Sequence, residues 1–206
     1  MPKSKKGWEE EYGKTYEDTH SQMARSETWR ILLTLVIQNN WKVRQWDVVA
    51  AYLNAPLTHK AYVQDGAEYW LLHKALYGLK QAGHEWYKML KDVMQQTGLQ
   101  QCIGDPGAFT NPTTKVTICT HVDDMARFAN SDKDLDNIET AIEEHVELEK
   151  LGIPIKILGM ELTWQEEPRS VKLTQTTVIG NLANSHIGLI IPLHHNQKPS
   201  LSSATH

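Results

Sequence analysis

An alternating run of apolar residues from Lys115 to Ala129 is interrupted near its middle by two adjacent aspartates, Asp123 and Asp124. Alternation with a period of two predicts two β-strands, and the acidic pair favours a turn between them. The segment therefore predicts a β-hairpin with two carboxylates at its tip. This feature constrains the fold most, because it specifies both a sheet and the place of two charges in it.

Strand and helix signals on either side extend this hairpin into a larger pattern. Lys42–Val48 predicts a strand that contains Asp47 near its end, and an amphipathic helix is expected from about His84 to Thr97. A second helix is expected over Asp132–Glu149, followed by a strand over Ile155–Trp164. The order strand, helix, hairpin, helix, strand is that of a ferredoxin-like sheet, so we expect the α+β class.

That topology brings the end of the first strand beside the tip of the hairpin, so Asp47 is expected to lie near Asp123 and Asp124. Clustered carboxylates repel one another, and a divalent cation removes that cost. Mg²⁺ takes oxygen ligands of this kind, and a pair of such ions can support an in-line displacement. The alternative interpretation of the aspartate pair is a solvent-exposed turn, which aspartate also favours.

Other signals predict elements outside this central pattern. A helix is expected over Glu27–Gln38 with Ser26 as its N-cap, and Ser131 is expected to cap the acidic helix. A helical turn at Ala50–Leu53 and three short strands complete the prediction. The three strands are Ala61–Gln64, Tyr69–Lys74 and Val171–Leu173.

Composition says little about partners. The net charge of −4 is weakly unfavourable for nucleic-acid binding, but residues 131–150 hold eight acidic and two basic residues, so the remainder is slightly basic. Cys102 and Cys119 form no disulfide framework or metal pattern, and free thiols suit a reducing compartment. No signal peptide and no apolar run of roughly 18 residues is evident. We expect a soluble, intracellular protein without a membrane partner.

Five motifs, in order, resemble those of copia-type retrotransposon reverse transcriptases. Together with a lead-in at Gly7–Thr19, the resemblance extends over about residues 7–194. It implies an RNA-directed DNA polymerase domain of a Gag-Pol polyprotein, with a palm and partial fingers but no thumb or RNase H. The motifs are Gln45–Leu57 (QWDVVAAYLNAPL), Ala75–Gln81 with Trp86 (ALYGLKQ....W), His121–Asp124 (HVDD), Leu158–Glu161 (LGME) and Leu173–Gln175 (LTQ).

The resemblance implies a role for each motif. Asp47, Asp123 and Asp124 would be the catalytic residues and would bind Mg²⁺ or Mn²⁺. Tyr52 would exclude a ribose 2′-hydroxyl, with a core aromatic ring as the alternative, and Lys150 or Lys156 would be a candidate proton donor to pyrophosphate. Gly78, Lys80 and Gln81 would lie near the nucleotide and template, with an ordinary turn and a surface lysine as alternatives, and Leu158, Gly159 and Met160 would form the primer grip.

The sequence also departs from this family. His121 replaces the aromatic residue of the metal motif, and Gly83–His84 replaces a proline and an arginine. The family's basic fingers segment is missing before Gly7. An acidic core without these cations is expected to hold an RNA/DNA primer–template and dNTP weakly, because phosphate neutralisation supplies most of such affinity.

We therefore expect a truncated or inactive polymerase fragment that lacks the remaining segments of its polyprotein. The alternative is a non-catalytic interaction protein that keeps the palm fold. In domain terms, residues 1–24 would be a remnant of the fingers and lead-in, residues 25–183 the palm core, and residues 184–206 a disordered tail.

Overall fold

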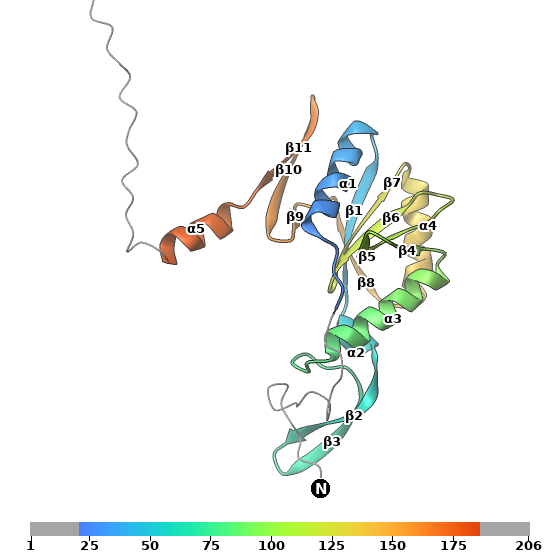
Figure 1. Cartoon of the computed structure of the whole chain (residues 1–206), viewed down its shortest axis with the longest axis vertical. Coiled ribbons are helices and arrows are strands. Elements are labelled where there is room, and N and C mark those ends of the chain that lie inside the picture. Colours follow the sequence, from blue (N-terminus) through green and yellow to red (C-terminus); the bar gives the residue numbers. More distant parts are fainter. Residues whose placement is uncertain (1–20, 186–206) are drawn as a thin grey trace, which may run out of the picture.

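A computed structural model of the chain describes residues 21–185, and a six-stranded antiparallel sheet forms its body (Figure 1). The strand order is β4-β5-β6-β7-β1-β8, so the first of these strands in the sequence lies near one edge, between β7 and β8. The strands are β1 (Lys42–Val48), β4 (Gln100–Cys102), β5 (Asp105–Thr110), β6 (Thr117–His121), β7 (Asp124–Ala129) and β8 (Leu148–Gly152).

Helices cover both faces of this sheet, and alternate residues of each strand supply two separate cores. Trp46 and Met125 pack into one core with α3 (Ala82–Gln96) and α4 (Asp132–Glu143). Val43 and Phe128 lie an odd number of positions from Trp46 and Met125, so they face the opposite way and pack with α1 (Ser26–Gln38). We call these the α3/α4 face and the α1 face. This two-sided burial follows from the period-two alternation of strand side chains.

Two smaller sheets extend from the body. A hairpin of β2 (Pro56–Asp65) and β3 (Glu68–Lys74) projects at one end, after the short helix α2 (Ala51–Asn54) (Figure 1). The other small sheet has the order β11-β10-β9 and leads into α5 (Thr176–Ser185). Its strands are β9 (Lys156–Ile157), β10 (Met160–Glu166) and β11 (Arg169–Thr174).

The residues just before α1 lie against strands β5 and β6 of the central sheet. The amide of Ala24 donates a hydrogen bond to the carbonyl of Thr120 at 2.8 Å. A Cβ atom added at Gly107 would lie only 1.9 Å from the Ala24 nitrogen, so only glycine permits this close approach. The segment before α1 is thereby held against β5 and β6.

One predicted cap was correct and one was wrong. The side chain of Ser131 accepts a hydrogen bond from the Asp134 amide at 3.2 Å and caps α4 as predicted. Ser26, in contrast, is the first residue of α1 and makes no capping bond. Asp105, in a distant strand, ties down the start of this helix, because its carboxylate accepts from the Arg25 amide and the Thr28 hydroxyl.

The acidic helix α4 is six residues shorter than the predicted Asp132–Glu149. The helix ends at Glu143, and the last two residues of its expected range, Leu148 and Glu149, begin β8, which forms one edge of the central sheet. The predicted closing strand, Ile155–Trp164, instead contributes to the three-stranded sheet. Glutamates and lysine suit a helix, but Val146 and Leu148 are buried two positions apart, which is the period of a strand.

The predicted α+β class agrees with the structure at the level of a mixed fold with antiparallel sheets. The expected disordered tail from residue 186 onward and residues 1–20 of the expected lead-in lie outside the described residues. Within residues 21–185, no helix has both the length and the apolar composition needed to cross a bilayer. Cys102 and Cys119 are free thiols, and burial raises the pKa of Cys119 above its ordinary range.

Candidate active site at the tip of the β6–β7 hairpin

The three predicted aspartates lie at one end of the central sheet. Asp47 and Asp124 are directly opposite each other in the antiparallel β1–β7 register. Asp123 belongs to the two-residue turn between His121 and Asp124, and its carbonyl accepts a hydrogen bond from the Val48 amide at 3.1 Å. Residues separated by more than seventy positions in the sequence are therefore neighbours through strand pairing.

The turn that carries Asp123 has a strained backbone. Val122 has a φ of 63°, in the left-handed region that β-branched residues avoid. This conformation costs about 1–2 kcal/mol for a residue other than glycine. The buried indole of Trp86 in α3 donates a hydrogen bond of 2.7 Å to the Val122 carbonyl. A contact from a distant helix thus fixes a turn that its own sequence disfavours.

Like charges accumulate around Asp47. Burial, followed by the charges of Asp123, Asp124 and Glu149, raises the pKa of the Asp47 carboxyl. Glu149 stands opposite Asp47 in the β1–β8 register and was not identified from the sequence, because its segment had been assigned to a helix. None of the ion pairs between described residues involves any of the three aspartates. The only side-chain hydrogen bond to them within this part of the chain comes from Gln45 to Asp124, at 3.3 Å.

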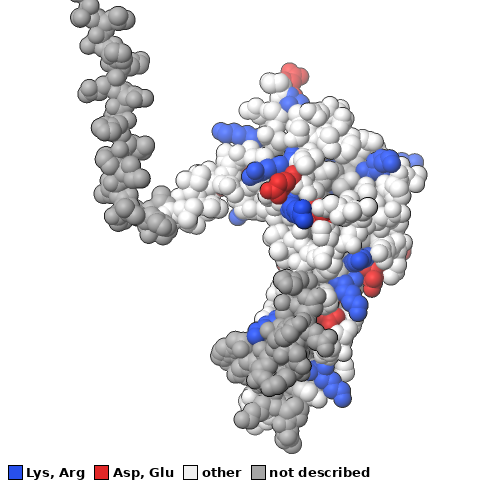
Figure 2. Space-filling view, viewed as in Figure 1, with Lys and Arg blue, Asp and Glu red and all other residues white. Residues whose placement is uncertain are grey.

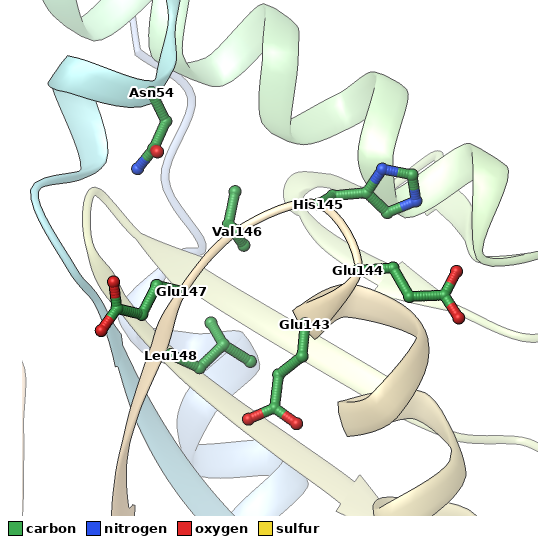
Figure 3. Close-up of a pocket in the computed structure, with 7 residues that line it drawn as sticks. All are labelled: Asn54, Glu143, Glu144, His145, Val146, Glu147 and Leu148. Atoms are coloured by element: carbon green, nitrogen blue, oxygen red, sulfur yellow. The ribbon is translucent and has the colours of Figure 1, made fainter.

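The carboxylates fit a divalent cation in donor type and in charge. Their side chains do not converge on a single metal position. Residues 21–185 contain no group of three or more His, Cys, Asp or Glu side chains arranged to hold a metal ion. A neighbouring pocket of about 420 Å³ is also acidic, but its carboxylates point in different directions (Figure 3). It lies between α2 and the α4–β8 connection and is lined by none of the predicted site residues.

Two tyrosines lie beside the aspartates. The rings of Tyr52, in α2, and Tyr77, in the connection between β3 and α3, have centroids 4.5 Å apart. Burial and the charge of Asp123 raise the pKa of both phenols, and Asp47 adds to the effect at Tyr77. Tyr77 is 53% exposed and was missed by the sequence analysis, although it stands inside the ALYGLKQ motif that the analysis singled out.

The other residues of that motif form the turn into α3. Gly78 has a φ of 98°, a conformation suited to glycine. Lys80 is half-buried, and Gln81 is buried immediately before the helix. The Gln81 side-chain oxygen has no hydrogen-bond partner among the described residues. The turn thus lies at the start of the helix that holds Trp86.

The predicted primer-grip residues belong to a different sheet from the aspartates. Leu158 and Gly159, with φ values of 51° and 74°, form the turn between β9 and β10, and Met160 begins β10 and is buried. Only Gly159 adopts such a conformation without strain. The turn is thus a tight connection between the paired strands β9 and β10.

The candidate proton donor Lys150 lies on the α3/α4 face. Its ammonium group pairs with Glu139 and Glu143, each at 2.9 Å, and its register partner is Trp46 rather than Asp47. Its strand neighbour Glu149, and not Lys150, lies on the side of the aspartates, and the predicted role of Lys150 stays a prediction. Lys156 is exposed in β9.

Behind the aspartates, the α3/α4 face holds a buried ion pair. Arg127 is almost fully buried, pairs with Glu139 of α4, and lies 3.8 Å from the centre of the Trp46 ring. The Trp46 indole donates to Glu139 at 2.9 Å. Burial lowers the pKa of Arg127 to about 10 against the opposing effect of Glu139. Burial alone would raise the pKa of Glu139, but hydrogen bonds from Lys150, Trp46 and Arg127 lower it to about 2.

Comparison with known proteins decides what this arrangement belongs to. The family model described as reverse transcriptase (RNA-dependent DNA polymerase) matches residues 3–187, which is most of the chain. The chain belongs to this reverse transcriptase family. The predicted resemblance to copia-type reverse transcriptases is thereby confirmed, and membership of the family implies a requirement for divalent metal in general.

Relatives of this reverse transcriptase chain include retrotransposon polyproteins of Saccharomyces cerevisiae. The transposon Ty1-DR4 and Ty1-DR6 Gag-Pol polyproteins are each 33% identical over 150 residues, which cover 65% of this chain and 9% and 8% of those proteins. The truncated transposon Ty1-A Gag-Pol polyprotein is 32% identical over 147 residues, covering 65% of this chain and 12% of that protein. The chain therefore spans about a tenth of the length of these curated relatives.

Proposed function

We propose that the end of β1 and the tip of the β6–β7 hairpin form the nucleotidyl-transfer centre of this reverse transcriptase chain. The observation that carries the proposal is the register of Asp47 opposite Asp124, with Asp123 in the adjoining turn. The accumulated negative charge that raises the pKa of Asp47 supports a site for cations. Two divalent ions, Mg²⁺ or Mn²⁺, would supply activation of a primer 3′-hydroxyl and stabilisation of the triphosphate.

In this proposal the chain's own residues orient the reactants. Asp47 and Asp124 present their carboxylates from two hydrogen-bonded strands, and Asp123 presents a third from the turn. Oxygen donors on rigid strands favour one geometry of the bound cations. The proximity of Tyr52 to Asp123 supports its proposed role as a steric gate against a ribose 2′-hydroxyl.

Further residues are proposed to contact the substrates. Lys80 would meet a phosphate, and the turn with Gly78 and Gln81 would lie beneath the nucleotide and template. Gly159 permits the close backbone approach that a primer grip at Leu158–Gly159–Met160 would need.

The sheet also supports a proposal about the fold. The strands β6, β7, β1 and β8 are adjacent in the order of a ferredoxin-like sheet, with α3 and α4 packed on one face. We infer that these elements correspond to a polymerase palm and that the β2–β3 hairpin corresponds to part of the fingers. The proposed substrates are an RNA or DNA primer–template and a dNTP.

We expect this chain on its own to bind a primer–template weakly. On the face in Figure 2, Lys and Arg side chains are scattered over the body and the projecting hairpin and do not merge into one basic patch. Phosphate neutralisation supplies most of the sequence-independent affinity for nucleic acid. Metal binding is therefore the more direct first test of the centre.

Calorimetric titration with Mn²⁺ tests the metal site directly. We expect the wild-type chain to bind Mn²⁺ and Asp123→Asn to bind it much more weakly, because a charged oxygen ligand is lost. Asp65→Asn, which removes an exposed carboxylate in the β2–β3 hairpin, is the matched control. Equal binding by wild type and Asp123→Asn would contradict the proposal.

Primer extension on a homopolymer template then tests the activity. Extension that depends on divalent metal and on Asp123 supports nucleotidyl transfer by this chain. A chain that binds no metal and extends no primer would favour the alternative function, a non-catalytic interaction protein with the same fold.

A further inference from the structure

We propose that Trp86 is a positioning residue that holds Asp123 in place through the carbonyl of Val122. The inference rests on the proposed function, in which Asp123 is a metal ligand. The Trp86 indole bonds to the carbonyl of Val122, which belongs to the peptide that precedes Asp123. Its helix, α3, begins directly after the ALYGLKQ motif, so the bond also connects that motif to the hairpin.

The strained turn explains why an outside contact is needed. Val122 has a φ of 63°, and a β-branched side chain disfavours this region strongly. A strained residue keeps such a conformation only when its surroundings over-determine it. The indole N–H of Trp86 meets the Val122 carbonyl at 2.7 Å and supplies one such constraint.

A second hydrogen bond fixes the next peptide from the opposite side. The amide of Val48, one residue after Asp47, donates to the carbonyl of Asp123 at 3.1 Å. The Asp123 backbone is thus bracketed by α3 through Val122 and by β1 through its own carbonyl. Loss of the first bond leaves Val122 free to relax toward negative φ, which would move the Asp123 side chain relative to Asp47.

The position of Trp86 suits this role. Its side chain is 1% exposed and packs in the core between α3 and the sheet, so the indole cannot turn away without opening that core. An indole has one donor and no acceptor, and a smaller aromatic ring would keep part of the packing but lose the bond. The proposal therefore separates the hydrogen bond from the bulk of the ring.

The test compares two tryptophans that differ in this one respect. Trp29 is also 1% exposed, but its indole nitrogen has no hydrogen-bond partner among the described residues. Trp86→Phe and Trp29→Phe remove the same ring volume, and only the first removes a hydrogen bond. We measure Mn²⁺ binding to the full chain by electron paramagnetic resonance, together with the thermal midpoint of each variant.

We expect Trp86→Phe to bind Mn²⁺ roughly fivefold more weakly than the wild type, the effect of one ordinary hydrogen bond. Trp29→Phe should bind Mn²⁺ like the wild type, although both variants lose thermal stability to a similar extent. Equal Mn²⁺ affinities of the two variants would overturn the proposal. If Trp86→Phe does not fold, replacement of the Trp86 indole by benzothiophene removes the donor and keeps the shape.

A double-mutant cycle tests whether the bond acts through the turn. Glycine adopts the left-handed conformation without strain, so Val122→Gly removes the reason for the turn to relax. Trp86→Phe should therefore weaken Mn²⁺ binding less in the Val122→Gly background than in the wild type. The same loss in both backgrounds would show that Trp86 does not act through Val122.

Nuclear magnetic resonance separates this inference from the proposed function. If Asp123→Asn binds Mn²⁺ like the wild type, the metal proposal fails, but the conformation of Val122 can still be measured. The one-bond Cα–Hα coupling distinguishes positive from negative φ. Loss of positive φ in Trp86→Phe and its retention in Trp29→Phe support the positioning role, and retention in both overturns it.

Discussion

The two faces of strands β1 and β7 treat charge in opposite ways. On the α3/α4 face, Arg127 and Glu139 are buried as a pair, and the Trp46 ring contacts both of them. On the α1 face, Asp47 and Asp124 stand opposite each other with no ion-pair partner among the described residues. Trp46 and Asp47 are sequence neighbours, so a single step along the strand separates compensated charge from uncompensated charge.

The difference is what the proposed cation site on the α1 face would require. A buried pair keeps the fold only while both partners remain, because either charge alone is costly in the interior. Like charges in register destabilise a sheet in the absence of a cation. The first face holds its charges as a buried pair, whereas the second would gain stability from the proposed cation.

The largest effect is expected from breaking the buried pair. Glu139→Gln leaves the Arg127 charge buried without its counter-ion, which should lower the free energy of unfolding by about 3–5 kcal/mol. Urea denaturation measures this change. Glu143→Gln is the matched control, because within residues 21–185 Glu143 pairs only with the half-exposed Lys150, and its loss should cost less than about 1 kcal/mol. Equal costs for the two variants would contradict the contrast between the faces.

The second effect is expected from adding the proposed cation. Mn²⁺ at about a hundred times its dissociation constant should raise the free energy of unfolding by about 3 kcal/mol, because it binds the folded state only. Asp123→Asn should abolish this gain. Thermal unfolding with and without Mn²⁺ measures both. A wild-type chain that gains nothing from saturating Mn²⁺ would show that the α1 face does not bind it.

The third effect is an opposite response of the two faces to acid. Glu139 has a pKa of about 2 against an ordinary value of 4.5, so the stability it contributes above pH 4.5 is lost as the pH falls toward 2. The pKa of Asp47 is raised above its ordinary value of 3.8. Its ionisation therefore lowers stability as the pH rises from 3.8 through the raised pKa.

Substitutions at these two positions should change the acid response in opposite directions. Stability should decline less on acidification in Glu139→Gln than in the wild type, and more steeply in Asp47→Asn. Urea midpoints between about pH 6 and about pH 3 measure the slopes. Identical slopes in all three proteins would contradict the opposite pKa shifts.

The smallest effect is expected at the exposed edge of the α3/α4 face. Arg44 bridges Asp132 and Asp136 near the start of α4, and both carboxylates are more than half exposed. Arg44→Gln should therefore cost about 1 kcal/mol or less, and the cost should shrink in high salt. Denaturation at low and high ionic strength checks this. A cost near that of Glu139→Gln would mean that burial does not govern these pairs.

Much of the fold could be predicted locally. Strand β1, the β2–β3 and β6–β7 hairpins, helix α3 and the cap at Ser131 follow from periodicity, turn residues and capping chemistry. The end of α4 could not be predicted, because glutamate and lysine suit a helix and β8 is a strand only through pairing with β1. Glu149 was missed for the same reason.

The identity of the carboxylates could be predicted, but not their surroundings. Asp47, Asp123 and Asp124 stand out as acids at a strand end and a turn. The bond from Trp86 to Val122, the tilted ring contact of Tyr77 with Tyr52 and the ion pair of Arg127 with Glu139 all join distant segments. No local pattern specifies such contacts.

The sequence by itself determined the family, the period of the strands in both predicted hairpins and the acids at the β6–β7 tip, because each is encoded in residues that are near one another in the chain. Only the tertiary structure decided which charges are compensated. Strand register placed Glu149 beside Asp47 and Lys150 behind it, and α4 brought Glu139 to Arg127. Electrostatic energy depends on distances in space and on burial, and both are fixed only when the sheet assembles.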